Sequence, residues 1–201
     1  MRKLLQRRKE AYQRSFQKHG TVARALKWQT QKAANIRYQN LTAEIDFNGK
    51  SVIDLGCGFG DAIPFIEKKS KNFTYLGVDL VPEFIQEARR RYPKHSFLVG
   101  PWQELIRKSD IILLSGALNS KVGKGEYSYR RKAISLMYQH ANEALAFNMA
   151  GGFPQPKNKS KNKVYYVDSL KILKFCYSLT GKVILRHHYR KKDFTIVVFR
   201  S

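Results

Sequence analysis

The chain has 201 residues and a formal net charge of +23, from 38 lysines and arginines against 15 aspartates and glutamates. This length suits one domain with a proper hydrophobic core, and no apolar run approaches the ~20 residues that a membrane span needs. The charge favours contact with nucleic acid, an anionic membrane or an acidic partner. Because the basic residues are spread along the whole chain, a generally lysine- and arginine-rich composition explains the charge equally well.

Cysteine usage bears on the compartment. Cys57 and Cys176 form neither a disulfide framework nor a metal-binding pattern, so we expect a reducing environment and no metal. The N-terminus has no secretory h-region, which predicts a cytoplasmic protein. An organelle-targeting peptide is the alternative, because no acid precedes Glu10, but the basic composition continues through the whole chain.

The N-terminal segment predicts two basic helices. In the first, apolar residues form a partial stripe at helical spacing among arginines and lysines, and His19-Gly20 ends the helix. The second covers about 23–42. We expect residues 1–45 to form a basic helical cap, followed by a ligand-binding domain over 46–201.

An apolar strand over 51–55 runs into glycines at alternate positions, Gly56, Gly58 and Gly60, and a helix over about 61–69 follows. Glycines at this spacing let the backbone turn sharply and approach a ligand without a Cβ in the way. The turn leaves free backbone amides at a helix start, where polar or anionic ligand groups bind. The segment therefore predicts a nucleotide-type cofactor site.

Acidic residues beside these glycines discriminate between cofactors. In the dinucleotide fingerprint G-x-G-x-x-G, the third glycine packs the helix against the strand, but Asp61 stands at that position. Asp54, inside the strand end, would repel a pyrophosphate but suits a cofactor that carries an ammonium group. A dinucleotide-dependent oxidoreductase is therefore disfavoured and is kept as the rival enzyme class.

A second buried strand over 73–79 ends in Asp79, nineteen residues after Gly60. A carboxylate at this position can accept hydrogen bonds from both hydroxyls of a ribose, as in nucleotide-binding α/β folds. A helix over 82–92 follows, with Pro82 suited to its first turn. The alternative is that Asp79 only caps this helix, but the glycine loop and the strand-end acid together favour the ribose.

The rest of the chain alternates strands and helices, which predicts an α/β fold with a mostly parallel sheet and helices on both faces. The last two strands are joined by a short basic turn and predict an antiparallel hairpin. The further strands are expected at 95–99, 110–116, 145–150, 182–189 and 193–200, and the further helices at about 102–108, 127–144 and 168–179. A Gly-, Pro- and Lys-rich stretch over 151–163 predicts a loop at the ligand edge, as a lid, an anion-binding loop or a plain connection.

The run from Val52 to Gly60 resembles motif I of the class I S-adenosylmethionine (SAM)-dependent methyltransferases, V-[IL]-[DE]-x-G-x-G-x-G. The block from Gly49 to Asp61 also resembles that of a subfamily of small bacterial-type members, and this resemblance covers most of the chain. It implies SAM as the cofactor of residues 46–201 and a seven-stranded sheet in the order 3-2-1-4-5-7-6. By the same resemblance, Asp79 binds the ribose and Leu80 lies against the adenine.

The resemblance also assigns residues to the rest of the pocket. Many relatives carry an acid that binds the adenine where this chain has Pro101. We expect Trp102 to stack on the adenine instead, or Glu104 to take the place of the missing acid. The alternative is that Trp102 is only a core residue. Ser115, at the end of the fourth strand, should border the methyl group and the substrate. The other candidates are Asp54, Gly56, Gly58 and Gly60 for the cofactor, Arg37 for its methionine carboxylate, His19 as a general base, and Asn119 and Asn148 for orienting the substrate.

The sequence indicates the cofactor better than the acceptor. It contains neither the N-P-P-Y run of base amino-methyltransferases nor the Pro-Cys pair that attacks pyrimidine carbons. These absences disfavour methylation of the exocyclic amines of bases and of the cytosine carbon. We expect methyl transfer to an oxygen or nitrogen of a small molecule, because the chain is compact. The alternatives are an RNA methyltransferase that uses the basic surface and a non-catalytic SAM-fold protein that binds nucleic acid. No oligomeric state is predicted.

Overall fold

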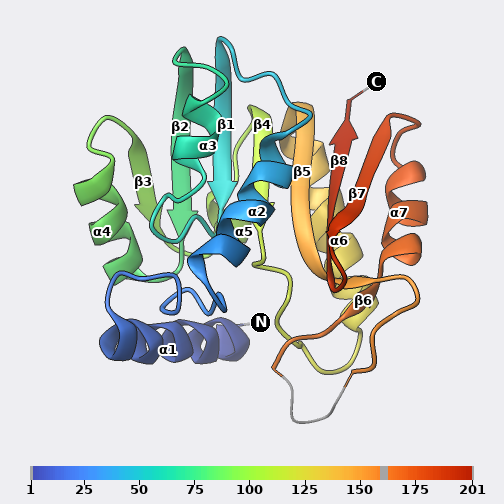
Figure 1. The fold of residues 1–201 in the computed structure, drawn as a ribbon, viewed down its shortest axis with the longest axis horizontal. Helices are drawn as coiled ribbons and strands as arrows, with labels where there is room; N and C mark the ends of the chain where they lie inside the picture. Colours follow the sequence, from blue (N-terminus) through green and yellow to red (C-terminus); the bar gives the residue numbers. More distant parts are fainter. Residues whose placement is uncertain (1, 159–162, 201) are drawn as a thin grey trace.

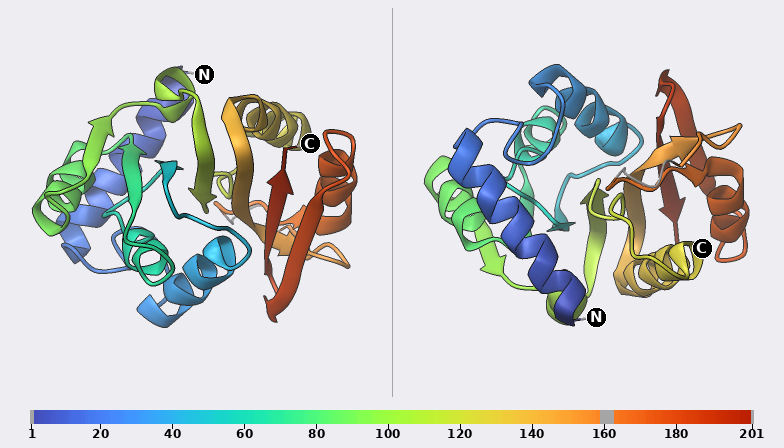
Figure 2. Two further views of the ribbon diagram at one scale, coloured as in Figure 1. Left: turned by 90° about the horizontal axis from the view of Figure 1, so that it is seen from above. Right: turned by 90° about the horizontal axis from the view of Figure 1, so that it is seen from below.

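A computed structural model describes residues 2–158 and 163–200. They form three layers, with helices on both faces of one central sheet (Figures 1 and 2). The strands are β1 (Lys50–Leu55), β2 (Phe73–Asp79), β3 (Ser96–Val99), β4 (Ser109–Ser115), β5 (Ala141–Gly152), β6 (Val167–Asp168), β7 (Val183–Arg190) and β8 (Asp193–Phe199). The helices are α1 (Arg2–His19), α2 (Gln31–Thr42), α3 (Ile63–Glu67), α4 (Pro82–Arg91), α5 (Trp102–Leu105), α6 (Glu126–His140) and α7 (Ser169–Tyr177).

The strand order is β3-β2-β1-β4-β5-β8-β7, which is the order that the resemblance implies. The pairs from β3 to β5 are parallel, and β8 runs antiparallel to both of its neighbours, with Ile196 opposite Phe147 of β5. The α/β fold class and the terminal hairpin are therefore confirmed. The structure adds β6, a short strand of two residues that pairs with the end of β5.

Successive side chains of each strand point to opposite faces of the sheet, so that two apolar cores form, one on each face. Val52, Ile111 and Leu113 pack with residues of α2, α3 and α4, whereas Ile53 and Ile112 pack with residues of α5, α6 and α7. Because both faces of the parallel strands are covered, these strands read in the sequence as nearly continuous apolar runs. The polar ends of the strands are then left to form a site at the sheet edge.

The two N-terminal helices occupy different places. α2 packs on the sheet and contributes Tyr38 and Leu41 to the core. α1 lies across the carboxyl end of the parallel strands (Figure 1) and packs through Tyr12 and Phe16 against Phe84 of α4. Within residues 1–45, which we expected to form a cap, only α1 therefore lies in the position of a cap. α2 belongs to the core of the sheet domain.

Several element boundaries differ from the predictions. α2 begins at Gln31 rather than near residue 23, because the Thr30 hydroxyl accepts a hydrogen bond (3.1 Å) from a backbone N–H of the first turn. α6 ends at His140 rather than at residue 144, because β5 starts with the next residue and pairs with β4 and β8. α3 and α5 are also shorter than predicted.

Candidate cofactor and acceptor site

The glycine loop after β1 requires backbone without side chains. Gly56, Gly58 and Gly60 have φ angles of +75°, +56° and +79°, a region that residues with a side chain rarely adopt. A Cβ on Gly58 would lie 2.9 Å from Leu26, and a Cβ on Gly60 would lie 3.0 Å from Tyr92. The loop therefore presents bare backbone at the sheet edge while it packs closely against neighbouring side chains.

Asp79, at the end of β2, is tied to this loop. Its Oδ2 accepts a hydrogen bond from the Gly58 N–H (2.9 Å), and its Oδ1 accepts one from the Val81 N–H (3.0 Å). Burial raises the pKa of the carboxyl to about 6, although the backbone hydrogen bonds oppose the rise. Each oxygen keeps a lone pair for a further donor. In the described chain no side chain caps α4, so Asp79 does not act as its cap.

Asp54 is buried beside the same loop, with 1% of its surface exposed. Its Oδ2 accepts a hydrogen bond from the Tyr75 hydroxyl (2.8 Å), and its Oδ1 has no hydrogen-bond partner among the residues that the structure describes. Burial raises the pKa of Asp54 to about 7; the Tyr75 hydrogen bond opposes this shift, and the charges of Asp79 and Asp61 add to it. A buried acceptor without a donor fits a ligand that carries an ammonium group nearby.

The raised pKa of Asp54 predicts a loss of stability with rising pH. The folded chain keeps a proton that the unfolded chain releases near pH 4, so stability falls as the pH rises from about 4 through 7. Asp54→Asn removes this ionisation and retains an acceptor for Tyr75. We expect the variant to be more stable than the wild type at pH 8 by on the order of 1–3 kcal/mol, with a smaller gain at pH 5, as measured by urea unfolding.

Asp110→Asn is the matched control for this prediction. Asp110 accepts hydrogen bonds from the backbone N–H (2.9 Å) and the hydroxyl (2.7 Å) of Ser51, and these hydrogen bonds lower its pKa. Its replacement should therefore reduce the free energy of unfolding at pH 8. If Asp54→Asn were no more stable than the wild type at pH 8, the buried ionisation at Asp54 would be disproved.

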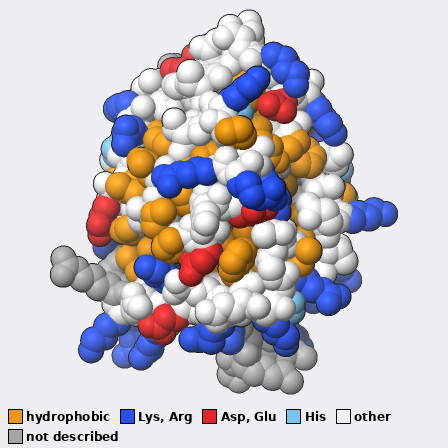
Figure 3. All heavy atoms as spheres, turned by 90° about the vertical axis from the view of Figure 1, so that its left-hand side faces the viewer, with side chains coloured by type: hydrophobic (Ala, Val, Ile, Leu, Met, Phe, Trp, Pro, Cys, Tyr) orange, Lys and Arg blue, Asp and Glu red, His pale blue; other side chains and the backbone are white. Residues whose placement is uncertain are grey.

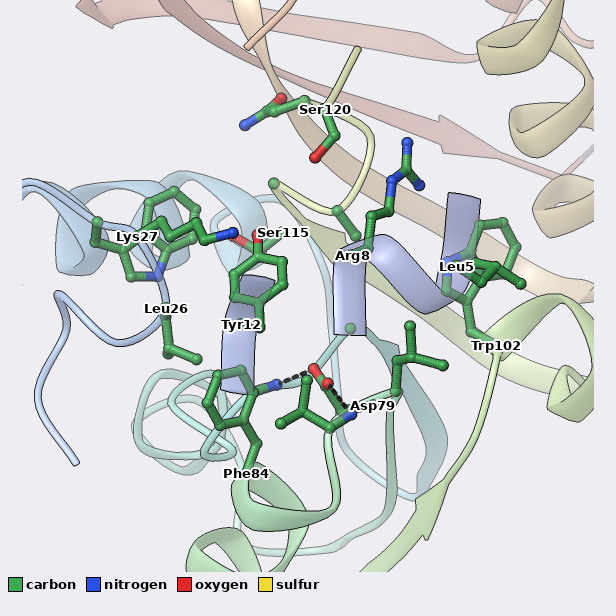
Figure 4. A pocket seen from close by; sticks show the side chains of 18 of the residues that line it. Leu5, Arg8, Tyr12, Leu26, Lys27, Asp79, Phe84, Trp102, Ser115 and Ser120 are labelled. Atoms are coloured by element: carbon green, nitrogen blue, oxygen red, sulfur yellow. Dashed lines mark hydrogen bonds between the residues drawn. The ribbon is translucent and has the colours of Figure 1, made fainter. Parts of the chain in front are cut away.

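A cavity lies at the carboxyl end of the sheet, between the glycine loop and α1 (Figure 4). The predicted site residues that line it are Gly56, Gly58, Asp79, Leu80, Trp102, Ser115 and Asn119. Other lining residues, which were not predicted, include Leu5, Arg8, Tyr12, Leu26, Lys27, Phe84, Ser120, Lys163 and Val164. Asp54 and Gly60 are not among the lining residues.

Polar residues at the ends of β4 and β5 are linked to one another. Asn148 donates from Nδ2 to the Ser115 hydroxyl (3.0 Å), and Asn148 itself is buried and does not line the cavity. Asn119 lines the cavity and is held there, because its Oδ1 accepts a hydrogen bond from the Ala150 N–H (2.7 Å). Of the two asparagine candidates, Asn119 therefore has the position to meet a ligand.

Two further candidates lie outside the cavity. Arg37 donates from Nη2 to Asp193 Oδ2 (2.6 Å), and its guanidinium lies 4.6 Å from the centre of the Trp28 ring. Its charge is thus paired at the contact of α2 with β8, so no methionine-carboxylate role follows for it. His19 ends α1 and is not a lining residue, so its position does not support the base role.

Trp102 combines the two roles that the sequence left open. Its side chain is buried in the same apolar core as residues of α6, and it also lines the cavity together with Pro101 and Gln103. Glu104, the substitute for the missing acid, is not a lining residue. Any adenine contact at this position is therefore apolar rather than through a carboxylate.

The cationic residues on the α1 side of the cavity were not predicted. Lys27 adopts a φ of +61°, which is rare outside glycine, and its Nζ lies 3.7 Å from the centre of the Tyr12 ring. Burial lowers the pKa of Lys27 to about 8, and the positive charges of Lys163 and Arg14 lower it further. The apolar stripe of the first helix indicated that α1 packs on something, but not which surface it covers.

Comparison with known proteins points to one family. A family model described as a methyltransferase domain matches residues 52–140. A protein of Mycobacterium tuberculosis that is named as a methyltransferase is 23% identical over 158 residues, which are 75% of this chain and 93% of the relative. The SAM-bound crystal structure of magnesium protoporphyrin IX methyltransferase from Synechocystis superposes with a TM-score of 0.62 at 18% identity, covering 85% of this chain and 79% of that one. The matched domain, this relative and the shared fold all indicate a class I SAM-dependent methyltransferase.

Two further proteins are similar to this chain. The fatty-acid O-methyltransferase of Mycolicibacterium smegmatis is 34% identical over 55 residues, which are 27% of this chain and 20% of the relative. A SAM-dependent methyltransferase structure from Listeria monocytogenes has a TM-score of 0.58 at 16% identity and covers 84% of this chain and 99% of that one. SAM is the cofactor, and the bare glycine loop and the spare acceptor positions of Asp79 fit it.

Proposed function

We propose that the methyltransferase holds SAM along the ends of β1, β2 and β4. Asp79 accepts hydrogen bonds from the two ribose hydroxyls through the lone pairs that Gly58 and Val81 leave open. Leu80 and Trp102 form an apolar wall for the adenine. The bare backbone around Gly58 makes room for the methionine part of SAM.

Bound SAM supplies a methyl group on a sulfonium, which is already activated for displacement. The enzyme's own residues therefore mainly have to align the acceptor and keep water out. The described lining residues include no histidine, and Asp79 is the one carboxylate among them. This composition supports alignment, rather than strong acid–base catalysis, as the main contribution of the chain.

For the acceptor, we propose an oxygen or nitrogen of a small molecule. The observation that carries this proposal is the position of α1, which lies across the ligand edge of the sheet and lines the cavity with Leu5 and Tyr12. Proteins that thread a nucleic-acid strand use an open basic groove with aromatic platforms. A cavity covered by a packed helix and lined by apolar side chains instead favours a small acceptor.

The net charge of +23 is the observation that favours RNA as the alternative acceptor. Figure 3 shows lysines and arginines on the side of α4 scattered among apolar and acidic side chains rather than in one continuous track. Electrostatic attraction of this kind binds nucleic acid without selecting a base for methylation. We therefore rank the small acceptor above RNA.

A labelling experiment tests whether the methyl acceptor is a small molecule or RNA. The protein is incubated with tritiated SAM and either total RNA or a metabolite extract, at low and at high salt. We expect label in small molecules, little dependence on salt, and no labelling by the Asp79→Ala variant. Label that enters RNA and falls steeply with salt would overturn the small-molecule proposal. RNA binding without label in any fraction would instead indicate a protein that only binds nucleic acid.

Among the described residues, no helix is long and apolar enough to cross a membrane. Cys57 and Cys176 are free thiols, and both are buried. We propose the cytoplasm as the location, since a reducing compartment keeps such thiols unpaired.

A further inference from the structure

The end of the cavity nearest α1 carries positive charge. Arg8 and Lys27 line it from α1 and the following turn, and Lys163 lines it from the segment after β5. Asp79, the one carboxylate among the described lining residues, is bonded to the glycine loop and is assigned to the ribose. Among the described lining residues, three cations therefore stand against one carboxylate, whose acceptor positions are assigned to the ribose.

Arg8 has donors to spare inside the cavity. Its Nη1 donates to the Tyr129 hydroxyl (3.1 Å), but its Nε and Nη2 are buried and have no hydrogen-bond partner among the described residues. Leaving donors of a charged group unpaired in a buried position costs free energy. An oxygen anion that enters the cavity would provide the missing acceptors, since a guanidinium binds carboxylate and phosphate in a fork.

Lys27 adds a second positive charge to the wall of the same cavity. Arg8 and Tyr12 are one turn apart on α1, and the Lys27 Nζ lies over the Tyr12 ring at 3.7 Å. Figure 4 shows Arg8 and Lys27 on either side of Tyr12, with Leu5 beyond Arg8. The low pKa of Lys27, about 8, reflects burial and the neighbouring charge of Lys163, both of which a bound anion would offset.

We propose that the acceptor is a small molecule with an apolar body and one anionic group, a carboxylate or a phosphate, which Arg8 binds while Lys27 adds charge. The apolar body lies against Leu5 and Tyr12. This inference rests on the proposed small-molecule function and specifies the class of substrate for the same site.

Rigid naphthalene probes test this assignment. Calorimetry in saturating S-adenosylhomocysteine (SAH) compares 2-naphthoate, 2-naphthyl phosphate and the neutral 2-naphthamide on the full-length protein. We expect an anionic probe to bind at least about tenfold more tightly than the amide, because hydrogen bonds to charged groups are the strong ones. The better of the two anions distinguishes a carboxylate acceptor from a phosphate acceptor.

Substitutions then assign the effect to Arg8. Arg8→Met should remove most of the preference for the anion, Lys27→Met should reduce it, and both variants should bind the amide and SAH as the wild type does. Arg7→Met, on the exposed side of the same helix, should change nothing. Tyr129→Phe removes the hydroxyl that accepts from Arg8 Nη1 but leaves the guanidinium and its charge in place, so this variant should keep the preference.

The assignment is overturned if neither anionic probe binds, if the amide binds as tightly as the anions, or if Arg8→Met behaves like Arg7→Met. These outcomes are separate from a failure of the proposed function. Tritium transfer into a neutral metabolite would disprove the anionic acceptor alone, whereas transfer into RNA would disprove the small-molecule proposal.

Discussion

Asp79→Ala is expected to weaken SAM binding at least about a hundredfold. The carboxylate offers one free lone pair on each oxygen to the two ribose hydroxyls, and each hydrogen bond to a charged group contributes roughly 1.5–3 kcal/mol. The substitution also releases the Gly58 N–H, which Asp79 Oδ2 now holds at 2.9 Å. Calorimetric titration with SAM and with SAH measures the loss.

The exposed Asp46, before β1 at the opposite end of the sheet, offers a matched control. Asp46→Ala changes the net charge by the same amount and should leave SAM affinity unchanged. Affinity in the wild type should also fall as the pH drops through about 6, because protonation of Asp79 removes acceptor lone pairs. Unchanged affinity in Asp79→Ala would refute the ribose role, and tight binding of NADH instead of SAM would indicate a dinucleotide enzyme.

Removal of α1, by deletion of residues 1–21, is expected to reduce methyl transfer roughly a hundredfold or more, because closure of the site and alignment of the acceptor depend on it. The core should remain folded. Among the described residues, α1 contributes no member to the two large apolar clusters and packs instead on Phe59 and Phe84 through Tyr12 and Phe16. Activity with a labelled acceptor and thermal unfolding of the truncated chain measure the two effects.

The control keeps the helix and changes only its exposed charges. Arg7→Met combined with Lys18→Met leaves the apolar contacts of α1 in place and should retain activity. A truncated chain with full activity would show that the segment is a basic tail for localisation or binding. Deletion through residue 40 is a poorer test, because it also removes Tyr38, which is buried in the core.

The cofactor end of the site was predictable because its determinants are local. Gly56 and Gly58 need a backbone conformation that the residue type alone reveals, and Asp54 and Asp79 end apolar strands at a fixed separation. Parallel strands bring their carboxyl ends to one edge, so two such segments meet without further information. The alternation predicted a mostly parallel sheet, and the strand order was what the family resemblance implied.

The acceptor end was not predictable because it depends on contacts between distant segments. Arg37 pairs with Asp193 through a contact that no spacing in the sequence indicates. Arg8 and Lys27 read as solvent-facing charges in a basic chain, and only the packing of α1 against α4 turns them into the cavity. Boundaries such as the start of α2 depended on a single capping hydroxyl, that of Thr30.

A crystal structure of the full chain with SAH tests the central claim most directly. It should show the ribose hydroxyls on the carboxylate of Asp79, the adenine between Leu80 and Trp102, and the sulfur open to the end of the cavity that Tyr12 and Lys27 line. SAH bound elsewhere, or a ribose that does not contact Asp79, would contradict the account.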